Sequence, residues 1–474
     1  MPSRKELTLE IDHAPSGPKV AAFFDVDRTL LAGFSAGAFM KDKWSKGDLD
    51  LSNMAKATLG AFRFGAGQTS FPSFLEETST NLVGLTEDEL LEEGRRVFEK
   101  HLVTDIYPES RALVEAHQAR GHTVVIVSSA THFQIDALAE ELGIEHVLCT
   151  ELEFDEEGRF TGRVERPAVW QQGKADVATA FASAHDIDLD QSYFYTDSHD
   201  DLPLLDLVAK PRLVNPDEEL ARIGARRGWP VYAFSSRGRP GRREIAGLLG
   251  SMASLGPAAL VALPTALATG SLRKGADVML STYAEMTTSA TGVELNVEGE
   301  EHLWSHRPAV FIFNHQSGID SLLMAQLTRR DVVGIAKKEL ETTPIVGPLM
   351  KAAGVVFVDR GDKDKAIEAM QPAVEAMREG LSVVIAPEGT RSATRKIGKF
   401  KKGAFHMAMA AGVPIVPVVL KNALDALPRH GMVIRPTTVD VVVHEPIPTA
   451  DWRREDLDAR IAEIEALYEE TLAG

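Results

Sequence analysis

The sequence has little cysteine, no excess of basic residues and no apolar stretch near its start. Cys149 is the one cysteine among 474 residues, so an internal disulfide is excluded, which is typical of a reducing compartment. The first twenty residues carry scattered charges and no apolar core, so we expect no secretory signal there. Lys and Arg total 51 against 69 Asp and Glu, a net charge of −18 that argues against nucleic acid as a partner.

What remains is the composition of an ordinary globular protein. Hydrophobic residues make up 44% and charged residues 25%, which excludes a wholly disordered or coiled-coil chain. The length predicts two or three domains. Residues 1–18 are polar and predict a tail.

The first predicted domain covers residues 19–240. Short apolar runs with helical stretches between them predict buried parallel strands of a doubly wound α/β sheet, at 20–24, 123–127, 146–149, 192–195 and 212–214. Residues 34–104 interrupt this alternation without a strong strand signal. We therefore expect them to form a helical insert, or cap, between the first two strands.

A charge-free segment over 245–272 follows this domain. Pro257 and Pro264 interrupt it, and Gly256-Pro257 is a turn signal. The piece before that turn would span only about 18 Å as a helix, too short to cross a membrane. We expect a helical hairpin over 241–290 that dips into one leaflet. The alternative is a helix pair buried under the next domain.

A second alternation of strands and helices begins near Val293. It predicts a second α/β domain over 291–474, with apolar strands at 309–313, 354–358, 382–386, 414–420 and 439–443. The last segment, 453–472, is typical of a charged amphipathic helix.

Polar side chains in the first domain follow the predicted strands. Asp25 and Asp27 come directly after the first strand, where open α/β sheets place their ligands. Matching groups follow later in the chain: the hydroxyl of Ser128 at the end of a strand, the cation of Lys174 at a helix start, and Asp197 with Asp201 after another strand. Each signal is weak alone, and the ordered set of four is specific.

This set resembles the haloacid dehalogenase-like phosphatases, particularly the branch that includes phosphoserine phosphatases. The resemblance implies that Asp25 is the nucleophile that forms an aspartyl phosphate, and that Asp27 protonates the leaving oxygen and then activates water. It implies a Mg²⁺ cofactor held by Asp25, Asp197 and the backbone carbonyl of Asp27, supported by Asp201. Ser128 would hold a phosphate oxygen, and Lys174 would neutralise the nucleophile and the phosphate.

The first motif also sets a requirement on Asp27 and departs from the family at Arg28. To act as an acid near neutral pH, Asp27 needs a pKa raised by its acidic neighbours. Arg28 stands where the family often has Gly, a position that varies among related chains.

The second domain carries another ordered set of polar residues. His315 follows a predicted strand, and Asp320 comes five residues later, a spacing that suits a base and the carboxylate that orients it. Arg360 ends a further strand region. The block Pro387-Glu388-Gly389-Thr390-Arg391 follows another strand, and Val413-Pro-Ile-Val-Pro417 comes last.

These blocks resemble the glycerolphosphate and lysophosphatidate acyltransferases over roughly residues 290–450. The resemblance implies that His315 deprotonates an acceptor hydroxyl while Asp320 orients it. The alkoxide would attack a thioester of coenzyme A or acyl carrier protein. Arg360, Arg391 and Lys337 would hold the acceptor phosphate, and Glu388 and Gly389 would shape the acceptor loop. Ala386 departs from the family, which usually has Phe there.

Taken together, the two sets predict a bifunctional enzyme at the cytoplasmic face of a membrane, peripheral or monotopic. Between Arg391 and Lys402 there are six basic residues and no acid, a stretch that would attract anionic headgroups or remain a solvated loop. The expected partners are the acyl thioester, lysophosphatidate or phosphatidate, and the membrane surface.

Several alternatives stay open from the residues. The phosphatase could act on phosphatidate, on lysophosphatidate or on a soluble ester such as phosphoserine. The acyltransferase could use another phosphorylated acceptor. One domain could be an inactive module that binds lipid.

Overall fold

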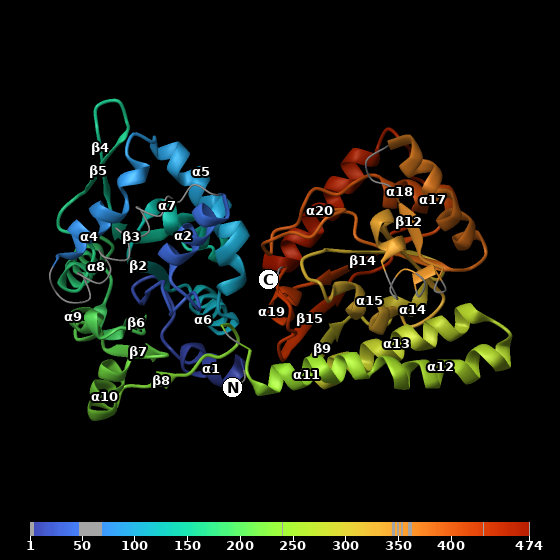
Figure 1. Cartoon of the computed structure of the whole chain (residues 1–474), viewed down its shortest axis with the longest axis horizontal. Helices are drawn as coiled ribbons and strands as arrows, with labels where there is room; N and C mark the ends of the chain where they lie inside the picture. The colour runs from blue at the N-terminus through green and yellow to red at the C-terminus, as the bar shows by residue number, and fades with distance from the viewer. Residues whose placement is uncertain are drawn as a thin grey trace. The chain divides into compact units, whose positions relative to one another are not determined.

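The computed structural model describes residues 4–46, 69–238, 240–343, 347, 350–351, 354–358, 363–429 and 431–473, with backbone alone for 4, 5, 45 and 363–369. The chain divides into two compact units, Met1–Arg239 and Pro240–Gly474 (Figure 1). Each is described by itself.

A six-stranded parallel sheet forms the centre of the first unit. Its strand order is β3-β2-β1-β6-β7-β8. The strands are β1 (Ala21–Phe24), β2 (Thr123–Thr131), β3 (His146–Thr150), β6 (Tyr193–Thr196), β7 (Lys210–Val214) and β8 (Val231–Tyr232). With its six strands renumbered 1 to 6 in chain order, the sheet has the doubly wound order 3-2-1-4-5-6, and the direction of winding reverses between β1 and β6.

Helices cover both faces of this sheet. The crossover helices are α6 (Pro108–Ala119), α7 (His132–Leu142), α8 (Gln172–Ala184) and α10 (Glu218–Arg227). Phe23 of β1 packs in one cluster with Ala178 of α8, whereas the ring of the next residue, Phe24, meets His117 of α6. Because successive strand residues point to opposite faces, β1 is buried on both sides, as its unbroken apolar run predicts.

The described parts of the insert are helical: α2 (Ser35–Lys46), α4 (Phe71–Thr78) and α5 (Glu87–Val97). Residues 47–68 of the predicted cap lie outside the described residues. Helix α5 lies on α7, where a Cβ at Gly94 would stand 1.7 Å from the Phe133 carbonyl oxygen. A short antiparallel hairpin, β4 (Leu152–Phe154) and β5 (Phe160–Val164), adds to this region.

The prediction of a polar tail over 1–18 is wrong. Residues 4–12 form helix α1 (Arg4–Asp12), which packs against α6. Leu7 and Ile11, four residues apart and so on one helical face, are almost completely buried, and Ala14 is buried beyond them. Three apolar residues among many charges were too few to indicate this helix.

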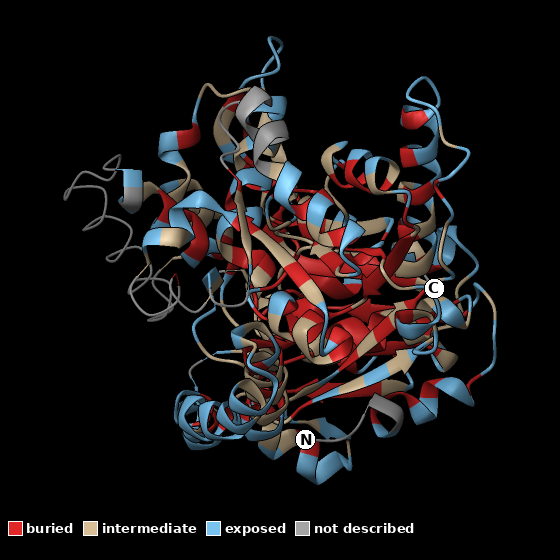
Figure 2. Cartoon of the chain, turned by 90° about the vertical axis from the view of Figure 1, so that its right-hand side faces the viewer, coloured by how far each residue is buried: buried red, intermediate tan, exposed pale blue. Residues whose placement is uncertain are grey.

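A mixed seven-stranded sheet forms the centre of the second unit. The order is β12-β11-β13-β10-β14-β15-β9, and all neighbours are parallel except β14 and β15. The strands are β9 (Val293–Glu298), β10 (Val310–Phe313), β11 (Val332–Lys337), β12 (Val356–Val358), β13 (Ser382–Ile385), β14 (Ile415–Leu420) and β15 (Thr437–Val443). Helices α15 (Asp320–Thr328), α17 (Lys363–Arg378), α18 (Gly403–Ala411) and α20 (Leu457–Ala473) accompany them. The central strands are buried, and the solvent-facing helices alternate between exposed and buried positions (Figure 2).

The apolar segment forms a helical hairpin, but its turn is not at Gly256-Pro257. Helices α11 (Arg242–Ala253) and α12 (Leu255–Thr269) follow one another almost without a break, and the chain turns at Gly270, where φ is +62°. Pro257 lies in the first turn of α12, where a backbone N–H needs no helical partner. Helix α13 (Leu272–Thr291) then returns beside α11 and α12 (Figure 1).

Because α11 and α12 are nearly continuous, the apolar helix is longer than the sequence indicated. The helical stretch Arg242–Thr269 is 28 residues long, and an 18-residue window within it has a mean hydropathy of 1.7 with 28% of its residues buried, so by length and composition the stretch could cross a membrane. The two arms differ: α13 packs against α15, whereas Leu260 and Leu267 of α12 are 72% and 74% exposed. The alternative of a buried helix pair therefore does not describe α12.

Candidate active sites

The first group of polar residues gathers where the strand order of the first sheet reverses. Asp25 follows β1 and Asp197 follows β6, and these two strands are neighbours in parallel register. The N–H of Asp25 donates to the Tyr195 carbonyl at 2.9 Å, which holds the two strand ends together. An open α/β sheet provides a ligand crevice at this point because the connections leave toward opposite faces.

Lys174 joins two of the predicted acids. Its Nζ donates to Asp25 Oδ1 at 2.6 Å and to Asp201 Oδ2 at 2.9 Å, and all three side chains are buried. These charges raise the pKa of Lys174 despite its burial, so it carries a positive charge. The hydroxyl of Thr196, a residue outside the sequence prediction, donates to Asp201 at 2.5 Å.

Asp27 is held by the start of the cap. Its Oδ1 accepts the Ser35 N–H at 2.7 Å, and its Oδ2 accepts the Ser35 hydroxyl at 3.3 Å. Burial raises the pKa of Asp27. The direction is the one predicted for an acid, but the main cause is desolvation rather than acidic neighbours.

Arg28 has a backbone conformation that favours glycine. Its φ is +59°, in the left-handed region that glycine adopts without strain. Its guanidinium lies 3.0 Å from Asp197 Oδ2. Even so, burial and the nearby Asp25 raise the pKa of Asp197 to about 8.

The chemistry of this donor set fits a Mg²⁺ ion. Burial is the main cause that raises the pKa of Asp25 to about 7. The charge of Asp201 adds to this shift, and Lys174 opposes it. Asp25, Asp27, Asp197 and Asp201 together place four carboxyl groups beside only two cations, Lys174 and Arg28. Carboxylate oxygens of this kind are the ligands that Mg²⁺ prefers.

Ser128 lies in β2 and is 2% exposed, and its hydroxyl accepts the Ala130 N–H at 3.2 Å.

The second group is built on the loop after β10. His315 Nδ1 lies 2.9 Å from Asp320 Oδ2, and the same oxygen accepts the N–H groups of Gln316 and Ser317, both at 2.8 Å. Asp320 is fully buried at the first position of α15. With Nδ1 donating to this carboxylate, Nε2 is the nitrogen left for proton transfer.

Glu388 links the loop after β13, in which it lies, to the loop that carries His315. Its carboxylate accepts the N–H of His315 at 2.6 Å, the N–H of Gly398 at 2.7 Å and the Ser392 hydroxyl at 2.8 Å. Gly389 has φ +76°, and a Cβ there would stand 2.7 Å from Lys401 Nζ, so only glycine fits without strain.

The remaining predicted residues are less well anchored. Arg391 is partly buried, and its NH1 donates to the Arg429 carbonyl at 3.3 Å. Lys337 is exposed at the end of β11. Arg360 lies outside the described residues.

Two family models match the chain, one on each unit. The model of the haloacid dehalogenase-like hydrolase matches residues 22–206, and the acyltransferase model matches residues 294–421. A histidinol-phosphatase of Neisseria meningitidis is 31% identical over 220 residues, which cover 46% of this chain and 99% of that protein.

The chain belongs to both families.

Relatives of the acyltransferase unit cover less of their own length. A 1-acyl-sn-glycerol-3-phosphate acyltransferase of Cocos nucifera is 36% identical over 178 residues, which are 37% of this chain and 57% of that protein. The chain thus spans less than two thirds of that relative. The crystal structure of the 1-acyl-sn-glycerophosphate acyltransferase of Thermotoga maritima is 23% identical with a TM-score of 0.41, covering 48% of this chain and 97% of that one.

Ser35, Thr196, Ser392 and Gly398 are site residues that the sequence did not reveal. Each is a small residue in a loop, at a strand end or at a helix start, and each acts through one or two hydrogen bonds to a predicted acid. Such residues are common in loops, so their type and spacing carry little signal.

Proposed function

We propose that this hydrolase–acyltransferase fusion is a bifunctional enzyme of phospholipid metabolism. Its second unit transfers an acyl group from acyl-coenzyme A or acyl carrier protein to 1-acylglycerol-3-phosphate and yields phosphatidate. Its first unit hydrolyses a phosphomonoester. The observation that carries acyl transfer is the pair of His315 with the buried Asp320, and the one that carries phosphate hydrolysis is Lys174 between two acids.

In acyl transfer, His315 Nε2 accepts the proton of the acceptor hydroxyl as its oxygen attacks the thioester carbonyl. The new C–O bond forms, the C–S bond breaks, and the proton passes from His315 to the leaving thiolate. Asp320 stabilises the imidazolium between these steps. Arg391, with Lys337 and Arg360, holds the acceptor phosphate, which guanidinium groups bind bidentately.

In phosphate hydrolysis, an oxygen of Asp25 attacks phosphorus, and the ester P–O bond breaks. Asp27 gives its proton to the leaving oxygen and then takes one from the water that cleaves the aspartyl phosphate. Ser128 and Lys174 hold the phosphate oxygens. Asp25, Asp197 and the Asp27 carbonyl, supported by Asp201, would hold Mg²⁺, whose charge reduces the repulsion between carboxylate and phosphate.

The phosphatase substrate has two candidates. A lipid phosphate is favoured by the fusion to an acyltransferase and by the apolar hairpin within the acyltransferase unit. A small soluble amino-alcohol phosphate is favoured by the similarity to histidinol-phosphatase along nearly its whole length.

We also propose that the second unit lies on the cytoplasmic face of a membrane. Helices α11 and α12 expose a set of large apolar side chains: Ile245, Leu249, Met252, Leu260, Val261, Leu263 and Leu267. Burying one such leucine in lipid contributes about 1.5–3 kcal/mol. The basic stretch 391–402 adds less than its composition indicates, because Arg395 pairs with Asp425 and Lys402 pairs with Asp458.

A lipid time course followed by mass spectrometry tests both activities. Full-length protein receives lysophosphatidate, an acyl-coenzyme A and Mg²⁺, beside the Asp25→Asn and His315→Ala variants, with histidinol phosphate and phosphoserine in separate reactions. We expect phosphatidate to form, and His315→Ala to prevent it. Diacylglycerol that disappears in Asp25→Asn indicates a lipid phosphatase, whereas phosphate release from a soluble ester alone indicates the second candidate. Phosphatidate formation unchanged in His315→Ala would refute the acyltransferase assignment.

A further inference from the structure

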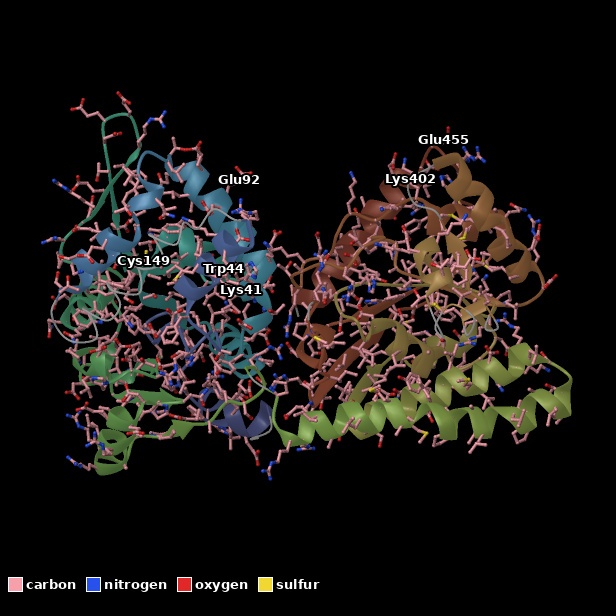
Figure 3. All side chains as sticks on the ribbon, viewed as in Figure 1. Lys41, Trp44, Glu92, Cys149, Lys402 and Glu455 are labelled. Atoms are coloured by element: carbon pink, nitrogen blue, oxygen red, sulfur yellow. The ribbon has the colours of Figure 1, made fainter. Side chains whose placement is uncertain are left out.

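A second cluster of potential metal ligands lies in the first unit, apart from the aspartates at the sheet's crevice. Ligand atoms of His132, Cys149 and Glu151 all lie within 4.8 Å of one another. The parallel register of β2 and β3 pairs Thr131 with Thr150, which brings the start of α7 beside the end of β3. Figure 3 labels Cys149 in this unit.

The histidine in this cluster is already oriented. Its Nδ1 lies 2.8 Å from Asp136 Oδ1, one turn further along α7, and its Nε2 lies 3.1 Å from Glu151 Oε1. A carboxylate on one ring nitrogen fixes the tautomer and leaves the other nitrogen for a metal, an arrangement that recurs at zinc sites.

Two carboxylates, of Asp136 and Glu151, flank the ring of His132. Hydrogen bonds to Asp136 and to the Cys149 thiol raise the pKa of His132 to about 11, so a metal ion would have to displace its proton. Burial raises the pKa of Cys149, and Glu151 and Asp136 add to this shift. A bound divalent ion would replace the protons and stabilise both the thiolate and the carboxylate.

From this geometry we propose that His132 Nε2, Cys149 Sγ and Glu151 form a binding site for a zinc-like divalent transition-metal ion, with Asp136 as a positioning residue. In a tetrahedral zinc site, ligand atoms lie about 3.4–3.6 Å apart, so a pair at the 4.8 Å limit would close by about 1 Å, whereas His132 Nε2 and Glu151 Oε1 are already close enough. Thiolate and imidazole ligands select such ions over Mg²⁺ and Ca²⁺.

The surroundings leave room for a fourth ligand. His132 and Glu151 line a small pocket of about 20 Å³, whose walls include Leu90 of the cap helix α5 and Leu152 of β4. This volume holds a water, which completes the coordination. The ion braces the start of α7, on which α5 lies at Phe133.

Cobalt provides a direct test because Cys149 is the one cysteine of the chain. Reduced full-length protein, stripped with a chelator, is titrated with Co²⁺. We expect a sulfur-to-cobalt charge-transfer band in the near ultraviolet that saturates at one equivalent and disappears when Zn²⁺ is added. Cobalt at the aspartates of the crevice cannot produce this band, because they offer no sulfur.

Variants separate a built site from a reactive thiol. Cys149→Ser should abolish the band, and Glu151→Gln, at an exposed position that does not threaten folding, should weaken Co²⁺ binding at least tenfold, as should His132→Gln. Asp136→Asn should weaken it by about 10–100-fold. His146→Gln, on the same strand, is the matched control and should bind normally.

Thermal unfolding gives a second measurement. Zn²⁺ should raise the unfolding midpoint of the wild type and of His146→Gln but not of Glu151→Gln. A missing charge-transfer band, or a band that keeps its affinity in both His132→Gln and Glu151→Gln, overturns the proposal.

Discussion

Replacing Asp320 with asparagine tests the acyl-transfer site with almost no change of shape. Asp320 Oδ2 accepts three hydrogen bonds, from His315 and from the N–H groups of Gln316 and Ser317. An amide oxygen can take this place and keep all three. The amide NH₂ then occupies the position of Oδ1, which is buried and has no hydrogen-bond partner among the described residues.

Two effects of different size follow from this geometry. An unpaired buried donor costs about 1–3 kcal/mol, so the free energy of unfolding should fall by that amount. The loss of the negative charge beside His315 removes stabilisation of the imidazolium, so the rate of acyl transfer should fall by about 10²–10⁴-fold.

The assay is the initial rate of phosphatidate formation, measured beside urea unfolding. Because Asp320 acts through His315, the double variant with His315→Ala should be no slower than His315→Ala alone. Asp277→Asn is the matched control. Asp277 lies in α13, and its buried carboxylate accepts the Asp331 N–H at 3.0 Å. This variant should lose stability but keep its rate of acyl transfer. Losses that multiply in the double variant, or an Asp320→Asn enzyme that keeps more than about a tenth of the rate, would refute the reasoning.

Three further outcomes follow from the structure. Lys174→Met leaves two buried acids without their cation, so it should abolish phosphate release and lower the unfolding free energy by about 3–5 kcal/mol. Lys19→Met, at an exposed ion pair, is the control. In urea unfolding and phosphate-release assays it should change neither the stability nor the activity. Without metal, the pKa values of Asp25 and Asp197 rise from 3.8 to about 7 and 8 on folding, so their contribution to stability is complete below pH 3.8 and is lost as the pH rises through 7 to 8. Mg²⁺ should therefore raise the melting temperature more at pH 8 than at pH 5, and an equal shift at both would contradict the assignment. Leu267→Glu should weaken flotation with anionic vesicles while phosphate release from a soluble ester stays unchanged; undiminished flotation would exclude α12 as the membrane contact.

Much of the fold was predictable because buried parallel strands are short apolar runs. Strands at 20–24, 309–313 and 414–420 were recognised for this reason, and the observed strands agree to within a residue or two. Helix α1 and the turn of the hairpin were not. A helix held by two buried side chains has a weak pattern, and a proline in the first turn of a helix looks the same in sequence as a proline in a loop.

For the site, the sequence by itself determined the chemical groups and the strand ends that carry them. It placed carboxylates after β1 and β6, and a histidine with its aspartate after β10, because those elements are local. Only the tertiary structure decided which groups meet. Lys174 lies 149 residues from Asp25, and Glu388 lies 73 residues from His315.

The physical reason is that contacts over such separations depend on strand order and helix packing, which no local pattern encodes. The same holds for Arg28, whose backbone angle and ion pair with Asp197 come from the loop it occupies. It holds as well for the cluster of His132, Cys149 and Glu151, which exists because β2 and β3 are neighbours in register. The sequence determined which functional side chains are present, and the packing of the sheets determined which of them lie in contact.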